Sequence, residues 1–155
     1  QGEDGYSKAE NVAASLGSIH CSTNGVQANE LQQLLLDAAT LSTATFDSCT
    51  CVIVKPHAVK SKNFGDILEH IVAQGYEISA AQSMIFEKAQ AEEFLKVYKG
   101  VLPDYADHVT QLAMGLCVAL EVRAENAVRT FRETAGPWDV EMAKDLRPDT
   151  IRGRY

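Results

Sequence analysis

Apolar residues follow different spacings on the two sides of residue 48. Over 30–39 they recur at i, i+3, i+4 and i+7, which predicts an amphipathic helix. Residues 1–28 are rich in Gly, Ser, Asn and Ala with little periodicity, so they predict loop or short helix. Residues 41–48 are small and mostly polar, which is the composition of a linker.

Beyond residue 48, strand-like and helix-like patterns follow one another. A β-branched run that Pro56 stops predicts the first strand, and Asn63 and Gly75 are placed to begin and end the next helix. In the last predicted helix, Val128 and Phe131 are expected to face inward. The predicted strands are 50–55, 76–86 and 116–122, and the predicted helices are 64–72, 91–99, 104–114 and 125–135. This order predicts an α+β fold, a ferredoxin-like sandwich with an antiparallel sheet covered by helices.

Charge and length restrict the partners. The chain has 155 residues, about one ordinary domain, and its formal charge is 14 − 21 = −7. An acidic chain repels phosphate backbones and anionic lipids, so we expect no nucleic acid and no membrane as partner. No apolar run approaches the ~20 residues that span a bilayer. A small phosphorylated ligand stays compatible, because a local cluster of cations can oppose the overall charge.

The four cysteines, at positions 21, 49, 51 and 117, are irregularly spaced. This spacing predicts reduced thiols in a cytoplasmic protein rather than a disulfide framework. A zinc ion held by His20 and the first three cysteines lacks a standard ligand spacing, so we expect no metal held by the protein itself.

A few polar residues are candidates for chemistry. Lys55 directly follows four apolar strand residues, so we expect it at a sheet edge or cleft, although an ordinary surface lysine gives the same pattern. Arg132 lies late in a predicted helix, where a cation also suits the helix dipole. His20 lies among small residues, which leave an imidazole accessible as a nucleophile. The sequence contains no P-loop, Rossmann, zincin or GxSxG pattern.

Four segments together resemble nucleoside diphosphate kinase. They are CVIVKPHAV (51–59), GDILEHIVAQGYEISAAQ (65–82), FRETAGP (131–137) and LRPDTIRGRY (146–155). The resemblance covers about residues 49–155 without a large gap. The EEFLKVYKG stretch and the insertion after GPW look most like the second domain of the tandem, cilium-associated type-7 subtype.

The resemblance implies a phosphohistidine relay, in which a histidine carries the γ-phosphoryl group from a nucleoside triphosphate to a diphosphate. It implies that Lys55, Arg132 and Arg152 bind the nucleotide phosphates, with Mg²⁺ bridging them, and that Tyr105 stacks on the base. Such transfer depends on positioning and on cationic charge more than on acid–base chemistry. Nucleoside di- and triphosphates are therefore the expected ligands, and self-association into a homo-oligomer is expected as well.

The order of the matching segments differs from the family's order. The family's catalytic histidine follows the IRG motif, whereas here the matching histidine is His20, near the start. Residues 1–40 thus resemble the C-terminal segment of a preceding kinase-like domain, 41–48 the linker, and 49–155 a second domain without its own histidine segment. A circular permutation, in which 1–40 completes 49–155, explains the same order.

Individual positions also depart from the family pattern. Leu95 replaces a pocket tyrosine, Trp138 or Asp139 stands in place of a phosphate-binding threonine, and Gly17 replaces an asparagine before the histidine. The leading hypothesis is therefore a weak or inactive kinase-type domain that serves as a ciliary, axonemal component bound to tubulin or axonemal proteins. The alternatives are an active, permuted kinase that uses His20, and an α+β binding module without a nucleotide site.

Overall fold

The computed structural model describes residues 3–17, 21–22, 24–35 and 42–155, which form two compact units, 1–42 and 43–155. The first unit contains α1 (Glu3–Leu16) and α2 (Gly25–Leu35). Helix α2 begins earlier than the predicted 30–39 segment. Helix α1 is longer than the predicted loop or short helix. Ala9, Val12, Ala13 and Leu16 recur at i, i+3, i+4 and i+7, a helical spacing that the prediction missed. Gly17, with φ +70°, follows its end.

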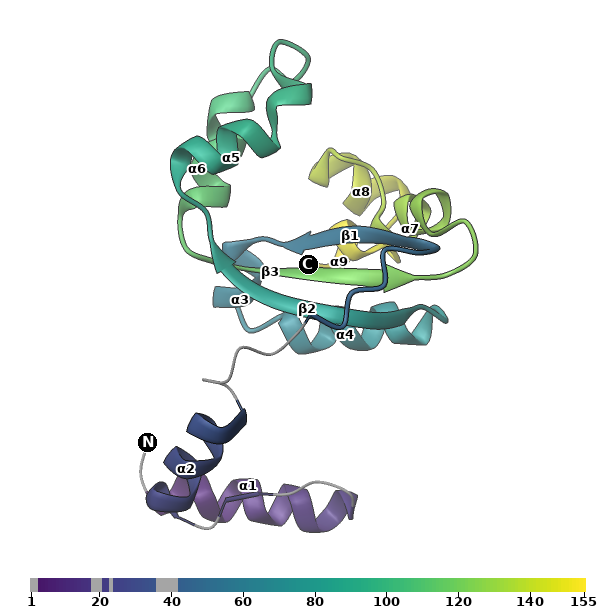
Figure 1. The fold of residues 1–155 in the computed structure, drawn as a ribbon. Helices are drawn as coiled ribbons and strands as arrows, with labels where there is room; N and C mark the ends of the chain where they lie inside the picture. The colour runs from purple at the N-terminus through teal and green to yellow at the C-terminus, as the bar shows by residue number, and fades with distance from the viewer. Residues whose placement is uncertain (1–2, 18–20, 23, 36–41) are drawn as a thin grey trace. The chain divides into compact units, whose positions relative to one another are not determined.

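The second unit is built on a three-stranded antiparallel sheet (Figure 1). Its strands are β1 (Cys49–Val54), β2 (Glu77–Ile85) and β3 (Leu116–Arg123). The strand order is β1-β3-β2, and β3 pairs antiparallel with both neighbours. This arrangement confirms the predicted α+β, ferredoxin-like fold.

Helices occupy the connections between the strands and the segment after β3. They are α3 (Pro56–Lys60), α4 (Phe64–Ala73), α5 (Lys88–Phe94), the 3₁₀ turn η1 (Lys96–Tyr98), α6 (Tyr105–Ala113), α7 (Ala127–Ala135), α8 (Val140–Leu146) and α9 (Ile151–Arg154). The sequence did not predict α3, α8 and α9, which are four to seven residues long and too short to show a helical period. Pro56, interpreted only as the end of a strand, also begins α3, where its missing N–H costs nothing.

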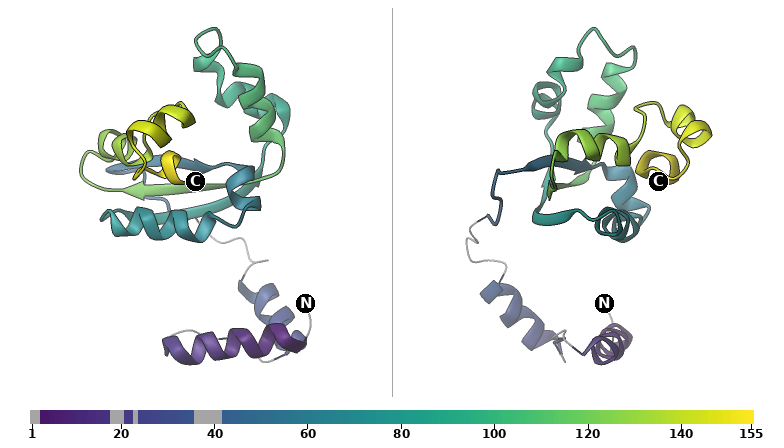
Figure 2. Two further views of the ribbon diagram at one scale, coloured as in Figure 1. Left: turned by 180° about the vertical axis from the view of Figure 1, so that it is seen from behind. Right: turned by 90° about the vertical axis from the view of Figure 1, so that its right-hand side faces the viewer.

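The side chains of β3 alternate between two hydrophobic clusters. Val118, Leu120 and Val122 join the larger cluster with residues of α4 and α7, which lie on the same side of the sheet (Figure 2, right). Cys117 joins the smaller cluster with residues of α5 and α6. The α5–α6 hairpin is therefore held to the sheet by a core of its own.

Helix α7 corrects one prediction. Phe131 is buried as expected, but Val128 is 59% exposed. Residues four apart share a helix face, so Ala127 packs inward with Phe131 and the neighbouring Val128 turns to solvent. Among the residues that the structure describes, no helix is long and apolar enough to cross a membrane.

Residues 43–48, whose composition is that of a linker, are fastened to the sheet by Glu121 of β3. This carboxylate is 9% exposed. It accepts hydrogen bonds from the Ser79 hydroxyl (2.6 Å), the Thr45 hydroxyl (3.0 Å), and the backbone N–H groups of Thr45 (2.7 Å) and Phe46 (3.0 Å). The Ser79 hydroxyl, followed by the Thr45 N–H, lowers the pKa of Glu121 to about 2.

Candidate functional site

Lys55 ends the first strand and precedes α3. Its backbone is still extended (φ −71°, ψ 158°), so it is the N-cap residue of α3. The side chain is half-buried. Burial is the main cause that lowers the pKa of its ammonium group, and the like charge of Arg152 lowers it further. Both causes disfavour the charged form of Lys55.

Arg152, in α9, lies close to Lys55. Its Nη1 donates to the carbonyl oxygen of Gly136 at 2.6 Å, which ties α9 to the segment after α7. Burial lowers the pKa of the Arg152 guanidinium, the Tyr98 hydroxyl opposes this, and the charge of Arg132 lowers it. In the described ranges, the ion pairs join Lys96 to Glu93, Arg123 to Glu77 and Arg154 to Asp149, so neither Lys55 nor Arg152 has a carboxylate partner there.

Two glycines permit the close packing of α9 against the segments that follow α7 and α8. Gly136 has φ +87°, and a side chain there would collide with Thr150. A Cβ at Gly153 would lie 2.6 Å from the carbonyl oxygen of Arg147. Because both positions lack a side chain, α9 packs directly against the ends of α7 and α8.

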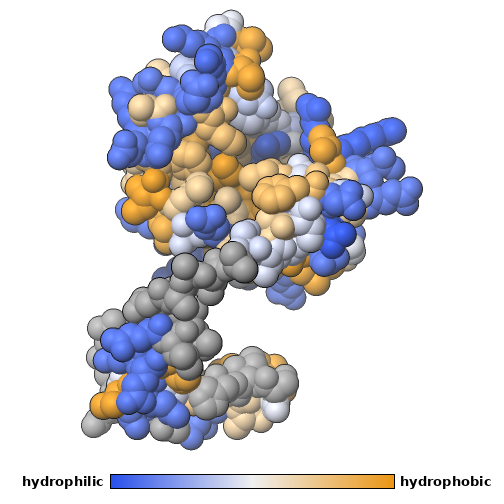
Figure 3. Space-filling view, in the orientation of Figure 1, coloured by the Kyte–Doolittle hydropathy of each residue, from blue (hydrophilic) through white to orange (hydrophobic). Residues whose placement is uncertain are grey.

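Trp138 contacts both cations. Its ring centroid lies 5.6 Å from Nζ of Lys55 and 5.3 Å from Cζ of Arg152, within the range of cation–π attraction. The rings of Tyr98 (5.4 Å) and His108 (5.2 Å) contact the same indole. Tyr98 and His108 come from the α5–α6 hairpin, while Trp138 precedes α8, and the surface between these parts is hollowed (Figure 3).

His108 is a further polar group at this place. Burial lowers its pKa, and the charge of Lys55 lowers it further against the opposing charges of Asp104 and Asp107. Its Nδ1 atom is buried and has no hydrogen-bond partner among the described residues. The lowered pKa favours a neutral imidazole beside the two cations. No motif in the sequence indicated His108 as a site residue.

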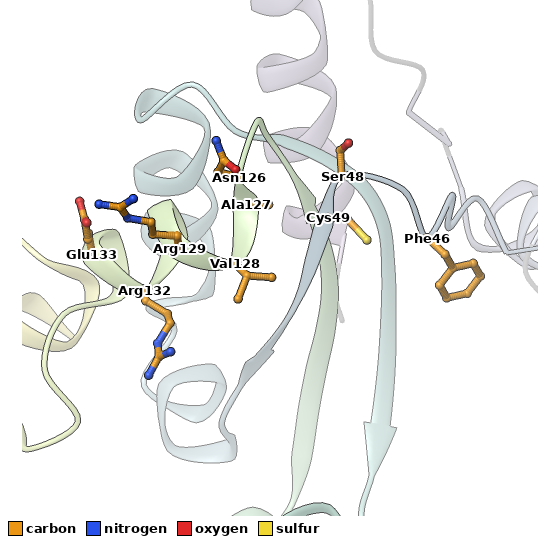
Figure 4. A pocket seen from close by; sticks show the side chains of 9 residues that line it. All are labelled: Phe46, Ser48, Cys49, Asn126, Ala127, Val128, Arg129, Arg132 and Glu133. Atoms are coloured by element: carbon orange, nitrogen blue, oxygen red, sulfur yellow. The ribbon is translucent and has the colours of Figure 1, made fainter.

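Arg132 lies at the edge of this group. It is exposed in the last turn of α7 and lines an open cavity of about 750 Å³ between α7 and the start of β1. Its guanidinium extends away from Arg129 and Glu133 on the same helix (Figure 4). Its charge lowers the pKa of Arg152, although the cavity is lined by neither Lys55 nor Arg152.

Tyr105, the predicted base-stacking residue, makes its contacts elsewhere. Tyr105 begins α6, packs against the smaller cluster and donates its hydroxyl hydrogen to the carbonyl oxygen of Glu92 at 3.0 Å. His20 lies outside the residues that the structure describes. Nowhere in the described ranges do three His, Cys, Asp or Glu side chains gather as metal ligands would.

Comparison with known proteins identifies the family. Residues 48–155 match the family model described as nucleoside diphosphate kinase. The chain belongs to the nucleoside diphosphate kinase family. Nucleoside diphosphate kinase homolog 7 of Rattus norvegicus is 47% identical over 114 residues, which are 74% of this chain and 29% of that protein. The nucleoside diphosphate kinase of Aquifex aeolicus is 32% identical over 106 residues, 68% of this chain and 74% of that protein.

Solved kinase structures share the fold. An orthorhombic crystal form of the Aquifex aeolicus nucleoside diphosphate kinase has a TM-score of 0.65 at 31% identity and covers 70% of this chain and 76% of that one. A nucleoside diphosphate kinase of Halobacterium salinarum in complex with CDP has a TM-score of 0.63 at 28% identity, covering 70% of this chain and 69% of that one. The chain thus spans less than a third of the homolog 7 sequence but most of a single kinase domain.

Proposed function

We propose that the 43–155 unit binds the phosphates of a nucleoside di- or triphosphate, with Lys55 and Arg152 as the central cations and Arg132 at the edge. The observation that carries the proposal is the pair of half-buried cations that repel one another and have no carboxylate partner in the described residues. Holding two like charges out of water is unfavourable unless an anion joins them. A phosphate group supplies the charge and the acceptor oxygens.

The family relationship supports this ligand, because the Halobacterium salinarum kinase was solved in complex with CDP. The site is rich in Lys and Arg and has no carboxylate cluster in the described ranges, so a Mg²⁺ ion fits here as part of the bound nucleotide. When bound, the ion neutralises phosphate charge. Lys55 and Arg152 orient the phosphate oxygens.

The test is calorimetry with Mg·ADP on the full chain. We expect Lys55→Met to weaken binding about ten- to hundredfold, the scale of a hydrogen bond to a charged group. Lys60→Met removes the same charge from an exposed position in α3 and is the matched control. Equal weakening by both variants, or no binding by the wild type, would overturn the assignment.

We further propose that phosphotransfer through His20 is weak or absent. The departures at Leu95, Trp138 and Gly17 support this, because each removes a residue type expected at the site. Incubation with γ-labelled ATP tests it. An acid-labile, base-stable label that appears on the wild type and disappears in His20→Ala would favour the active, permuted kinase.

We also propose that the chain spans the junction of two tandem domains and that it is an axonemal component. Both proposals rest on the resemblance to the type-7 subtype. The 47% identity to homolog 7 supports the first. For the second, we expect cosedimentation with axonemal microtubules that survives removal of the charges of Lys55, Arg132 and Arg152. A wild-type chain that stays in the supernatant would contradict it.

A further inference from the structure

The indole of Trp138 lies where a ligand of both cations would have to bind. A phosphate that contacts Lys55 and Arg152 needs its oxygens about 3 Å from each charged group. Both cations lie over the ring, with its centroid 5.6 Å from one and 5.3 Å from the other, so the indole occupies space next to both. Where the resemblance implies a phosphate-binding threonine, this chain therefore carries a group that covers the cations.

Two further rings pack against the indole. Tyr98 lies 5.4 Å away at an interplanar angle of 31°, and His108 contacts the ring edge-on at 5.2 Å and 70°. The backbone on both sides of Trp138 is fixed, by the bond from Arg152 to Gly136 and by Asp139, whose carboxylate caps α8 through the Met142 N–H. Movement of the ring therefore means rotation of its side chain within an otherwise fixed segment.

We propose that Trp138 is an aromatic plug of the phosphate site and lowers the affinity of that site for phosphates. This inference rests on the proposed function. The ring attracts both cations but accepts no hydrogen bond from them, whereas a phosphate does both. A ligand with two or three linked phosphates offers enough oxygens to displace the ring from both cations. A monophosphate displaces it from one cation, so the plug costs a monophosphate one cation–π contact and a larger ligand two.

The experiment measures binding of inorganic pyrophosphate, ADP and AMP to the wild type and to Trp138→Ala by calorimetry. We expect the variant to bind pyrophosphate and ADP about five- to thirtyfold more tightly, the gain from two lost cation–π contacts. AMP should gain less, so the preference for ADP over AMP should grow. Trp138→Phe keeps a ring with weaker attraction and should lie between. Val140→Ala, a half-exposed residue of the same segment, should bind like the wild type.

A second readout needs no variant, because Trp138 is the only tryptophan in the sequence. Displacement by pyrophosphate exposes the indole to water, so its emission should shift to longer wavelength. An unshifted emission under saturating pyrophosphate would overturn the plug.

The outcomes separate the two proposals. Equal affinities of wild type and Trp138→Ala would overturn the plug and leave the phosphate site intact. Weaker ADP binding with unchanged pyrophosphate binding would show that the ring stacks on the base, which also overturns it. No binding of any probe by either protein would overturn the phosphate site and the plug together.

Discussion

The surroundings of Glu121 and those of Lys55 and Arg152 differ in how they stabilise a buried charge. The Glu121 carboxylate receives hydrogen bonds from two hydroxyl and two backbone N–H groups of its own chain. Lys55 and Arg152 face an aromatic ring and each other. A charge whose partners are all internal fastens the fold, whereas a charge left without a counter-charge is available to a ligand.

The pKa values express the same difference. The pKa is lowered at both Glu121 and Lys55. For a carboxylate, a lower pKa means that the surroundings favour the charged form. For an ammonium group it means that they disfavour the charged form. At Lys55 the free energy of holding the charge away from water is unfavourable in the free protein, and binding of an anion relieves it. Such shifted pKa values are typical of functional sites.

The largest effect on ligand binding is expected at Arg132. Arg132→Glu places a negative charge beside the cations, so we expect nucleotide and pyrophosphate binding to weaken about ten- to hundredfold. The matched control is Arg129→Glu on the same helix, whose side chain extends away from Arg132 (Figure 4). Calorimetry that gives the two variants equal affinity would remove Arg132 from the phosphate site.

A change at Glu121 should affect the fold and leave binding alone. In Glu121→Gln the acceptor is neutral and half of it becomes a donor, so the bonds to Thr45 and Phe46 weaken. We expect the amide protons of these two residues to exchange about tenfold faster with deuterium. Glu77→Gln removes a 66%-exposed carboxylate paired with Arg123 and should change little. Unchanged exchange in Glu121→Gln would show that other contacts hold residues 43–48.

The smallest expected effect is a pH dependence. The folded pKa of Glu121, about 2, lies below its ordinary value of 4.5. Its stabilisation of the fold is therefore complete above pH 4.5 and is lost progressively as the pH falls toward 2. Urea unfolding at pH 5, 4 and 3 should show the wild type approaching Glu121→Gln in free energy of unfolding. A difference that stays constant over this range would contradict the assignment.

The sequence predicted the elements whose pattern is local and long enough to repeat. The three strands and the helices α4, α6 and α7 come from such patterns, and Gly75, with φ +85°, follows α4 where predicted. Helices α3, α8 and α9 are too short to show a period. Val128 was placed inward because apolar character was taken as burial, although helix geometry gives that face to Ala127.

For the candidate site, the sequence suggested the cations but not the contacts of Trp138. Motif resemblance placed Lys55, Arg132 and Arg152 together, and their electrostatic coupling is consistent with this. The sequence marked Trp138 as a departure, but its partners come from η1, α6 and α9 and from the end of β1, far apart along the chain. Such a cluster depends on tertiary packing, which no local spacing encodes.

The close packing at Gly136 and Gly153 has a consequence for variation at this site. Neither residue has a side chain to touch a ligand, yet each sets how near α9 approaches the end of α7 or α8 and hence where the Arg152 guanidinium lies. A side chain at either glycine must displace the neighbouring segment, even when the replacement carries no charge. A random library selected for loss of nucleotide binding should therefore return these two positions alongside the cationic ones, and their replacements should not be rescued by restoring charge nearby.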